Sequence, residues 1–424
     1  MDLLIYYHRA REMKNLKGRW VLLFILITGL SFYSCVDDHD PLPIVKDDQY
    51  FVSSEFKTQV TAQEIKFKLL IAQSVFPEVL SFVGLVRNNI DVQKITYTTT
   101  FQNKIIEASG LVYLPEAAGK YPVLCFQNGT NTQHSLAPSE DLESEMLFML
   151  ESVASMGFIV VIPDYIGFGI SSNLPHPYLH AQSTTQSILD MLRALNEFTT
   201  EDKNVAKPTK DLFLFGYSQG GWATMLLQKE IETNYSSEFN LVASSCAAGP
   251  YSLEDMNRYI TSKADYSTPY FLAYLLNAYT TLGLVTNPLS DFIKAPYVET
   301  IPALYDGNQS QGIINAALTT NMAELLTPDY REHNAVNPKF SAFHNVLMAN
   351  SVMPWKMTTP TRLYHGMEDE IIPLSMSQKT LLELKAAGTP DSTIQLIPIP
   401  EVGHTDGKIP TGILTILWFL EVKN

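Results

Sequence analysis

Ser218 lies in the pentapeptide GYSQG, and its surroundings fit those of a catalytic nucleophile. A serine hydroxyl is weakly nucleophilic at neutral pH, so it needs a base, and the base needs an acceptor that fixes its tautomer. Both partners follow later in the chain, because HGMEDEIIP contains Asp369 and EVGHTDG contains His404. These residue types predict acyl transfer, with Ser218 attacking a carbonyl carbon and His404 moving the proton. Glu368 and Glu370 flank Asp369 and are alternatives for the carboxylate.

The residues around Ser218 predict a strand that runs into a helix through one sharp turn. The segment from Leu212 to Phe215 is apolar without alternation, as in a central parallel strand covered on both faces. Gly216 and Gly220 leave the room that such a turn needs. Beyond the turn, apolar residues recur with the spacing of one helical face at Trp222, Met225, Leu226 and Ile231. The first backbone N–H of that helix would be free to bind an oxyanion.

The rest of the chain alternates between strand and helix patterns. Residues 94–100 and 107–114 predict a hairpin that turns at Gln102 and Asn103. Further strands are expected at 121–127, 158–162, 241–248, 361–364 and 394–399, and helices at 146–156, 181–198, 374–387 and 411–421. This alternation is typical of an α/β fold with a mostly parallel sheet and helices on both faces. The candidate carboxylate and histidine come directly after the last two strands.

One long stretch interrupts this alternation. Between residues 250 and 355 there is no clean strand pattern, so we expect a mainly helical cap or lid. It would divide the core into a first segment, 61–249, and a second, 356–424. The stretch is rich in apolar and aromatic side chains, among them Tyr266, Tyr270, Phe271, Tyr274, Leu275, Leu276 and Tyr279. These side chains could hold an acyl chain near the site or form an ordinary helical core.

Five motifs together resemble the α/β-hydrolase superfamily of serine hydrolases. They are GYSQG, HGMEDEIIP and GHTDG, with FQNGT at residues 126–130 and PDYIGFG at residues 163–169. The similarity covers about residues 90–424, and the position of the insertion resembles the secretory lipase branch. In that branch the strand before the oxyanion hole commonly ends in His-Gly, where this chain has Asn128 and Gly129.

This resemblance implies a role for each candidate residue. Ser218 is the nucleophile, His404 is the general acid/base, and Asp369, rather than a neighbouring glutamate, is the orienting carboxylate. The backbone N–H groups of Gln219 and Thr130 would form the oxyanion hole. Such a site needs no cofactor and no metal.

The implied activity is hydrolysis of a carboxylic ester by a lipase or carboxylesterase. An esterase that removes acetyl or feruloyl groups from polysaccharides is a second candidate. A catalytically inactive surface binding protein with a hydrolase fold is a third candidate, from another functional class. The intact triad and the glycines around Ser218 favour an enzyme over that third candidate.

The N-terminal residues predict export. Basic residues precede an uncharged apolar run from Trp20 to Tyr33, which is short for a bilayer span and fits a signal peptide over residues 1–34. Because the charged segment before Trp20 is long for a signal peptide, Met13 is an alternative initiator.

Cys35 closes the sequence SFYSC and is followed by an acidic stretch. This arrangement resembles the lipobox of bacterial lipoproteins in a relaxed form. It implies a lipid anchor on Cys35 that holds the protein to the outer membrane or cell surface of a Gram-negative bacterium. Residues 35–60 would then be a lipidated tether. A plain signal peptide with an accidental cysteine is the alternative.

Charge and composition argue against other kinds of site. The formal net charge of −15 would repel phosphates, so nucleic acid is not expected as a partner. Cys125 and Cys246 are expected on strands separated by a third strand, beyond disulfide reach, and are predicted to be buried core residues. His176 and His180 are four residues apart, but Pro177 and the lack of nearby carboxylates argue against a metal site.

Overall fold

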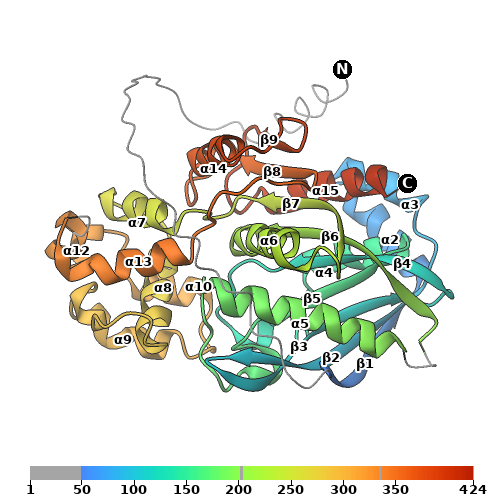
Figure 1. Cartoon of the computed structure of the whole chain (residues 1–424), viewed down its shortest axis with the longest axis horizontal. Coiled ribbons are helices and arrows are strands. Elements are labelled where there is room, and N and C mark those ends of the chain that lie inside the picture. The colour runs from blue at the N-terminus through green and yellow to red at the C-terminus, as the bar shows by residue number, and fades with distance from the viewer. Residues whose placement is uncertain (1–48, 201–203, 334–335, 424) are drawn as a thin grey trace. The chain divides into compact units, whose positions relative to one another are not determined.

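The computed structural model describes residues 49–200, 204–333 and 336–423. In these residues the chain forms a mixed, mostly parallel sheet of nine strands in the order β1-β2-β3-β5-β4-β6-β7-β8-β9 (Figure 1). The strands are β1 (Phe51–Val60), β2 (Ile90–Phe101), β3 (Lys104–Pro115), β4 (Gly119–Gln127), β5 (Ile159–Pro163), β6 (Ala206–Tyr217), β7 (Asn240–Ala247), β8 (Thr361–Gly366) and β9 (Ile394–Ile399). The predicted signal peptide and Cys35 lie outside the described residues.

The first strands of the sheet are antiparallel and the others are parallel. β1 pairs with β2, β2 with β3, and β3 with β5 in antiparallel register, whereas β5, β4, β6, β7, β8 and β9 run parallel. β2 and β3 form the predicted hairpin, which turns at Gln102 and Asn103 with φ of 48° and 61°. The parallel strands bring the carboxyl ends of β6, β8 and β9 to one edge of the sheet, where ligands of such sheets bind.

β1 corrects one prediction made from the sequence. The prediction of a tether over residues 35–60 is wrong for its last part, because Phe51–Val60 form an edge strand that pairs with β2. The sequence FVSSEFKTQV has no clean alternation, and its Val52 and Phe56 side chains are 44% and 58% exposed. An edge strand is held by backbone hydrogen bonds to one neighbour, so its side chains need not show the pattern of a buried strand.

Helices cover both faces of the sheet (Figure 1). α2 and α4 share one buried apolar cluster with α15 and the sheet, while α6 and α14 belong to a second cluster. α5 packs beside α6. These helices, with the short α3, are α2 (Ala62–Ala72), α3 (Leu80–Val83), α4 (Glu145–Ser155), α5 (Ala181–Thr200), α6 (Gln219–Glu230), α14 (Leu374–Ala386) and α15 (Lys408–Val422). The predicted fold class is confirmed.

Between β7 and β8 the chain leaves the sheet and forms a group of helices, called the cap below (residues 250–355; Figure 1). Its helices are α7 (Leu253–Ser262), α8 (Tyr270–Thr281), α9 (Tyr297–Leu304), α10 (Gln311–Ala317), α11 (Met322–Leu325), α12 (Pro328–His333) and α13 (Ser341–Ala349). The mainly helical insertion expected from the sequence is therefore present. Side chains of α7 and α8 belong to the same buried cluster as those of α6. This shared cluster packs the cap against the core.

Cys125 in β4 and Cys246 in β7 are free, buried thiols. β6 lies between their strands, as predicted. Burial raises the pKa of the Cys246 thiol to about 12, and it raises the pKa of Cys125 as well. Both side chains are therefore protonated core residues at neutral pH.

Candidate active site

Ser218 alone forms the junction between β6, which ends at Tyr217, and α6, which begins at Gln219. Its backbone adopts φ 60° and ψ −122°, a conformation that costs a non-glycine residue about 1–3 kcal/mol. The Ser218 N–H donates to the Ala247 carbonyl of β7 at 2.9 Å, which helps to hold the strained residue in place. The turn thus presents the serine at the carboxyl edge of the sheet, as the sequence predicts.

Two glycines make this turn possible. A Cβ on Gly216 would lie 2.2 Å from the Gly220 carbonyl oxygen, and one on Gly220 would lie 1.9 Å from the Gln127 carbonyl oxygen. Both obstacles are backbone atoms, so no side-chain rotation could relieve the clash. The glycines of GYSQG therefore allow α6 to approach β4 and β6 closely.

Ser218, His404 and Asp369 form a continuous line of hydrogen bonds. His404 Nε2 lies 2.9 Å from Ser218 Oγ, and His404 Nδ1 lies 2.6 Å from Asp369 Oδ2. Because a carboxylate only accepts, the neutral imidazole carries its proton on Nδ1 and accepts the serine hydroxyl at Nε2. Tyr217 fixes the histidine loop, since its hydroxyl donates to the His404 carbonyl at 2.6 Å. This arrangement can take a proton from the serine and return it to a leaving group.

Asp369 is the carboxylate that the structure places against the imidazole. It is buried, whereas Glu368 and Glu370 on either side are exposed. Its Oδ1 accepts the backbone N–H groups of Ile371 at 3.1 Å and Ile372 at 2.8 Å, which leaves Oδ2 for the imidazole. The loop after β8 therefore orients one oxygen of this carboxylate and presents the other.

His365 lies behind Asp369 and touches it. Its Nε2 donates to the Ile372 carbonyl at 2.8 Å and lies 3.3 Å from Asp369 Oδ2. Its Nδ1 accepts the Ser377 hydroxyl at 2.7 Å. Burial alone would raise the pKa of the Asp369 carboxyl, but the hydrogen bonds from His365 and His404 outweigh burial and lower it to about 2. Asp369 is therefore ionised at neutral pH.

The two predicted oxyanion donors lie on different elements. Gln219 is the first residue of α6, where backbone N–H groups have no partner within the helix. Thr130 lies in the loop after β4, which is tied to the loop after β5. There the Asn128 side-chain amide donates to the Pro163 carbonyl at 3.0 Å, and the Tyr165 hydroxyl donates to the Asn128 carbonyl at 3.1 Å. Oxyanion binding by the two N–H groups stays a prediction.

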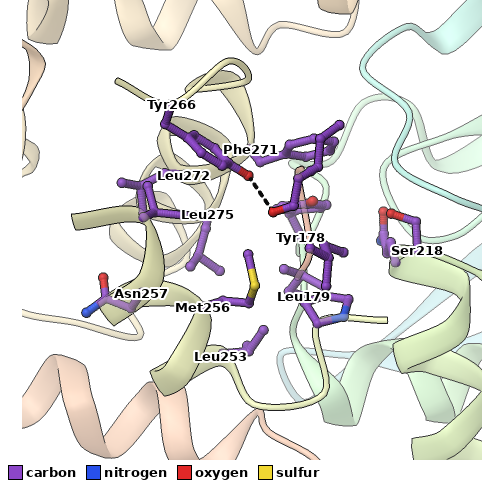
Figure 2. A pocket seen from close by; sticks show the side chains of 15 residues that line it. Tyr178, Leu179, Ser218, Leu253, Met256, Asn257, Tyr266, Phe271, Leu272 and Leu275 are labelled. Carbon is purple, nitrogen blue, oxygen red and sulfur yellow. Dashed lines mark hydrogen bonds between the residues drawn. The ribbon is translucent and has the colours of Figure 1, made fainter. Parts of the chain in front are cut away.

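An apolar pocket opens from Ser218 into the cap (Figure 2). It contains about 510 Å³ of space, part of it open to solvent, and Asn257 lies across the pocket from Ser218 in this view. The other side chains that line it are Tyr178, Leu179, Gln219, Pro250, Leu253, Met256, Ile260, Tyr266, Phe271, Leu272, Leu275, Ile371 and Ile372. Most of these walls are hydrocarbon, so the pocket suits an apolar group better than a charged one.

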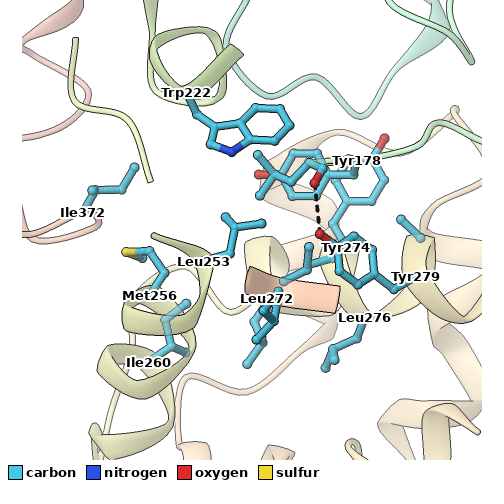
Figure 3. Close-up of a cluster of buried hydrophobic side chains, with 14 of the residues drawn as sticks. Tyr178, Trp222, Leu253, Met256, Ile260, Leu272, Tyr274, Leu276, Tyr279 and Ile372 are labelled. Carbon is cyan, nitrogen blue, oxygen red and sulfur yellow. Dashed lines mark hydrogen bonds between the residues drawn. The ribbon is translucent and has the colours of Figure 1, made fainter. Parts of the chain in front are cut away.

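The cap side chains expected near the site divide between this pocket and the core behind it. Three of them line the pocket: Tyr266, Phe271 and Leu275. The others do not line the pocket but belong to the buried apolar cluster: Tyr270, Tyr274, Leu276 and Tyr279, of which Figure 3 labels the last three. The core interpretation holds for these four, and acyl binding by the three pocket residues stays a prediction. Leu253 and Met256 of α7 also line the pocket, and no sequence signal had pointed to them.

The paired histidines after β5 do not form a common site. His176 is half-buried, and its Nδ1 donates to the Ile166 carbonyl at 2.7 Å. Burial lowers the pKa of His176 to about 4 despite this hydrogen bond, so its ring is neutral. His180 Nδ1 instead forms a hydrogen bond of 2.9 Å with Ser183 Oγ. Across the described ranges, no three His, Cys, Asp or Glu side chains gather in a way that could hold a metal ion.

Solved structures share the fold of this chain. A presumed hydrolase from Legionella pneumophila has a TM-score of 0.78 at 21% identity, covering 89% of this chain and 99% of its own. The rice cell wall degrading esterase LipA from Xanthomonas oryzae has a TM-score of 0.73 at 24% identity, covering 89% and 98%. Candida antarctica lipase A in its closed state has a TM-score of 0.62 at 18% identity, covering 88% and 81%. At such identities the likeness shows the α/β-hydrolase fold alone.

The family match goes further than the structural likeness. No curated protein matches this chain. Residues 139–418, however, match the secretory lipase family, and this span is well over half of the sequence. It contains the serine, the aspartate and the histidine of the hydrogen-bonded line, together with the whole cap. The chain therefore belongs to the secretory lipase family and is a carboxylic ester hydrolase.

Proposed function

We propose that the protein is an exported serine esterase or lipase that cleaves carboxylic esters through an acyl-enzyme on Ser218. The observation that carries this proposal is the hydrogen-bonded line from Asp369 through His404 to Ser218, which ends at the apolar pocket. A nucleophile, its base and a space for an apolar group thus lie together. Membership in the secretory lipase family supports the same reaction.

The first half of the reaction transfers the acyl group to the protein. Ser218 Oγ attacks the ester carbonyl carbon while His404 Nε2 accepts the hydroxyl proton, and the carbonyl oxygen becomes an oxyanion. The backbone N–H groups of Gln219 and Thr130 stabilise that oxyanion. When the tetrahedral intermediate collapses, the bond to the alcohol oxygen breaks and His404 returns its proton to the leaving alcohol. Asp369 stabilises the imidazolium throughout.

The second half releases the acid. Water takes the place of the alcohol, and His404 Nε2 accepts its proton as the oxygen attacks the acyl carbon. The second tetrahedral intermediate expels Ser218 Oγ, which recovers the proton from the imidazolium. The free carboxylic acid then leaves, and the hydrogen-bonded line is restored.

The acyl part of the ester occupies the pocket between Ser218 and the cap. Each methylene group moved from water onto hydrocarbon walls contributes about 0.8 kcal/mol, so a longer acyl chain gains binding energy there. Residues 250–355 thereby act as a cap that supplies the acyl site. The alcohol part of the ester then lies outside this pocket.

Replacing Met256 with tryptophan should shorten the acyl preference. Met256 lines the pocket from α7, and the larger indole would take the space of about two methylene groups. We expect kcat/KM for p-nitrophenyl palmitate to fall about 15-fold relative to wild type, because two methylenes contribute about 1.6 kcal/mol. The value for p-nitrophenyl acetate should change less than about twofold. A series of esters from acetate to palmitate measures the shift.

Met348→Trp is the matched control, because Met348 lies on cap helix α13 and its side chain is 48% exposed. This variant should keep the wild-type chain-length profile. If wild type prefers acetate and Met256→Trp affects all esters equally, the pocket does not bind the acyl chain. Removal of small acyl groups, as from acetylated or feruloylated polysaccharides, would then fit better.

We further propose that residues 1–34 are a signal peptide and that Cys35 carries a lipid anchor. The basic and apolar N-terminal pattern supports export, and family membership agrees with it. No helix within the described ranges is long and apolar enough to cross a membrane. With β1 beginning at Phe51, the tether that links Cys35 to the sheet is shorter than the sequence indicated.

Mass spectrometry of the mature N-terminus tests the anchor. We expect a first residue of Cys35 carrying acyl chains, and we expect the Cys35→Ser variant to accumulate as an unacylated precursor. The Cys125→Ser variant is the control, because that thiol is buried in β4 and should not affect processing. An unmodified Cys35 in the mature protein would contradict the proposal and leave a plain signal peptide.

A further inference from the structure

Two segments far apart in the sequence run beside each other where the cap meets the loop after β4. One is the loop of residues 128–134 after β4, called the oxyanion loop here, and the other is residues 305–311 of the cap, called the cap strap. Three hydrogen bonds join them directly. The His134 N–H donates to the Gly307 carbonyl at 2.8 Å, and the Thr132 hydroxyl donates to the Gln309 carbonyl at 2.8 Å.

Gly307 shows that this contact is closely fitted. Its backbone has φ of 85°, a region that favours glycine. A Cβ at this position would lie 2.1 Å from His134 Nε2, so the imidazole ring occupies the space that any other residue would need. The cap strap and the oxyanion loop therefore match in shape as well as in hydrogen bonds.

The third hydrogen bond is made by Gln311, the first residue of α10. Its side-chain Nε2 donates to the Thr130 main-chain carbonyl at 2.7 Å. Its Oε1 accepts the Tyr270 hydroxyl of α8 at 2.9 Å, which fixes the amide so that the donor faces Thr130. Gln311 thus connects a cap helix to the residue whose backbone N–H is a proposed oxyanion donor.

The side chain of Thr130 is held from a second direction. Its hydroxyl lies 2.9 Å from the Tyr178 hydroxyl. The Tyr178 ring stacks on Tyr274 with centroids 4.4 Å apart, and Tyr274 stacks on Tyr305 of the cap strap at 4.6 Å. Both the carbonyl and the hydroxyl of Thr130 are therefore held by groups that belong to the cap or pack against it. Its remaining backbone polar group is the N–H.

We propose that Gln311 is a positioning residue that sets the orientation of Thr130 and so completes the oxyanion hole only when the cap is seated. This inference rests on the proposed function, because it needs Thr130 N–H as an oxyanion donor. A donor that is displaced by about 1 Å loses most of its stabilisation of the transition state, at a cost of up to about 100-fold in rate. The cap then contributes to the chemical step as well as to acyl binding.

The Gln311→Met variant tests this role in the full chain, since methionine keeps the length of the side chain but cannot donate. We expect kcat for a medium-chain p-nitrophenyl ester to fall about 10- to 100-fold while KM stays within about twofold. We also expect an alkyl boronic acid, whose adduct with the serine is a tetrahedral anion, to bind more weakly by the same factor. A merely structural role would not change kcat and the boronate affinity together.

Asn315→Met is the matched control, because Asn315 lies on the same helix and its amide donates to the Ser267 carbonyl within the cap at 2.9 Å. This variant should lower the melting temperature about as much as Gln311→Met but leave kcat and boronate affinity unchanged. Equal kinetic losses in both variants, or a kcat within twofold of wild type in Gln311→Met, would overturn the inference. Absence of turnover in the wild type would instead reject the proposed function.

Discussion

Ser218→Ala should lower kcat for p-nitrophenyl esters about 10⁶-fold. The residual rate is the one that substrate binding and the oxyanion hole supply without a nucleophile. The reason is the loss of Oγ, the atom that His404 Nε2 contacts at 2.9 Å and that forms the acyl bond. The fold should be retained, because Ser218 keeps its strained backbone and its N–H bond to Ala247 without the hydroxyl. Steady-state kinetics and thermal unfolding of both proteins measure the two effects.

A fluorophosphonate probe gives an independent readout of the same serine. Wild type should become labelled on the peptide that contains Ser218, and the alanine variant should not be labelled. Ser262→Ala is the control, because Ser262 is an exposed residue at the end of α7. Retained turnover in Ser218→Ala would reject the serine as nucleophile. A folded wild-type protein that neither turns over nor reacts with the probe would favour an inactive binding protein.

Asp369→Asn should lower kcat about 10⁴-fold by reversing the histidine tautomer. In the structure, Oδ1 accepts two backbone N–H groups and Oδ2 accepts His404 Nδ1. The single oxygen of asparagine will keep the backbone bonds, so its NH₂ group will face the imidazole. His404 must then accept at Nδ1 and carry its proton at Nε2, where it can no longer take the proton of Ser218.

The same substitution should remove a pH-dependent contribution to stability. The folded pKa of Asp369 is about 2, below its ordinary value of 3.8, because its hydrogen bonds with His365 and His404 outweigh burial. A carboxyl with a lowered folded pKa stabilises the protein above its unfolded pKa and loses this effect as pH falls through the folded pKa. Wild type should therefore exceed Asp369→Asn by about 2 kcal/mol at pH 7, and the difference should shrink between about pH 4 and pH 2.

Urea unfolding of both proteins at several pH values measures this difference. Glu370→Gln is the control, since Glu370 is the exposed neighbour of Asp369 and its replacement should leave the free energy of unfolding nearly unchanged. A gap between wild type and Asp369→Asn that is the same at pH 7 and pH 2.5 would show that the ionised carboxylate is not the source of the stability.

Local patterns allowed the centre of the site to be predicted. The apolar strand before Ser218, the glycines around it and the helical spacing after it lie within one short stretch, so one turn type satisfies them all. Asp369 and His404 each follow a strand directly, and parallel strands bring such loops to one edge of the sheet. Hydrogen-bond distances confirm that these three residues meet.

Long-range contacts and one edge strand could not be read from the sequence. Gln311 and Thr130 are far apart in the chain and no sequence motif contains both, so only the folded cap brings them together. His365 precedes Asp369 by four residues, but its contact with the carboxylate depends on how the loop after β8 turns back. Phe51–Val60 lacks alternation because an edge strand packs against only one neighbour.

The position of the cap within the chain also sets an order on folding. Residues 248–360 separate β7 from β8, so the free edge of β7 gains its partner only after this whole stretch has been made. Synthesis runs from the N-terminus, and the Ser218 half is therefore complete before Asp369 and His404 exist. Hydrolysis can therefore begin only after β8 and β9 have joined the sheet and brought Asp369 and His404 to Ser218.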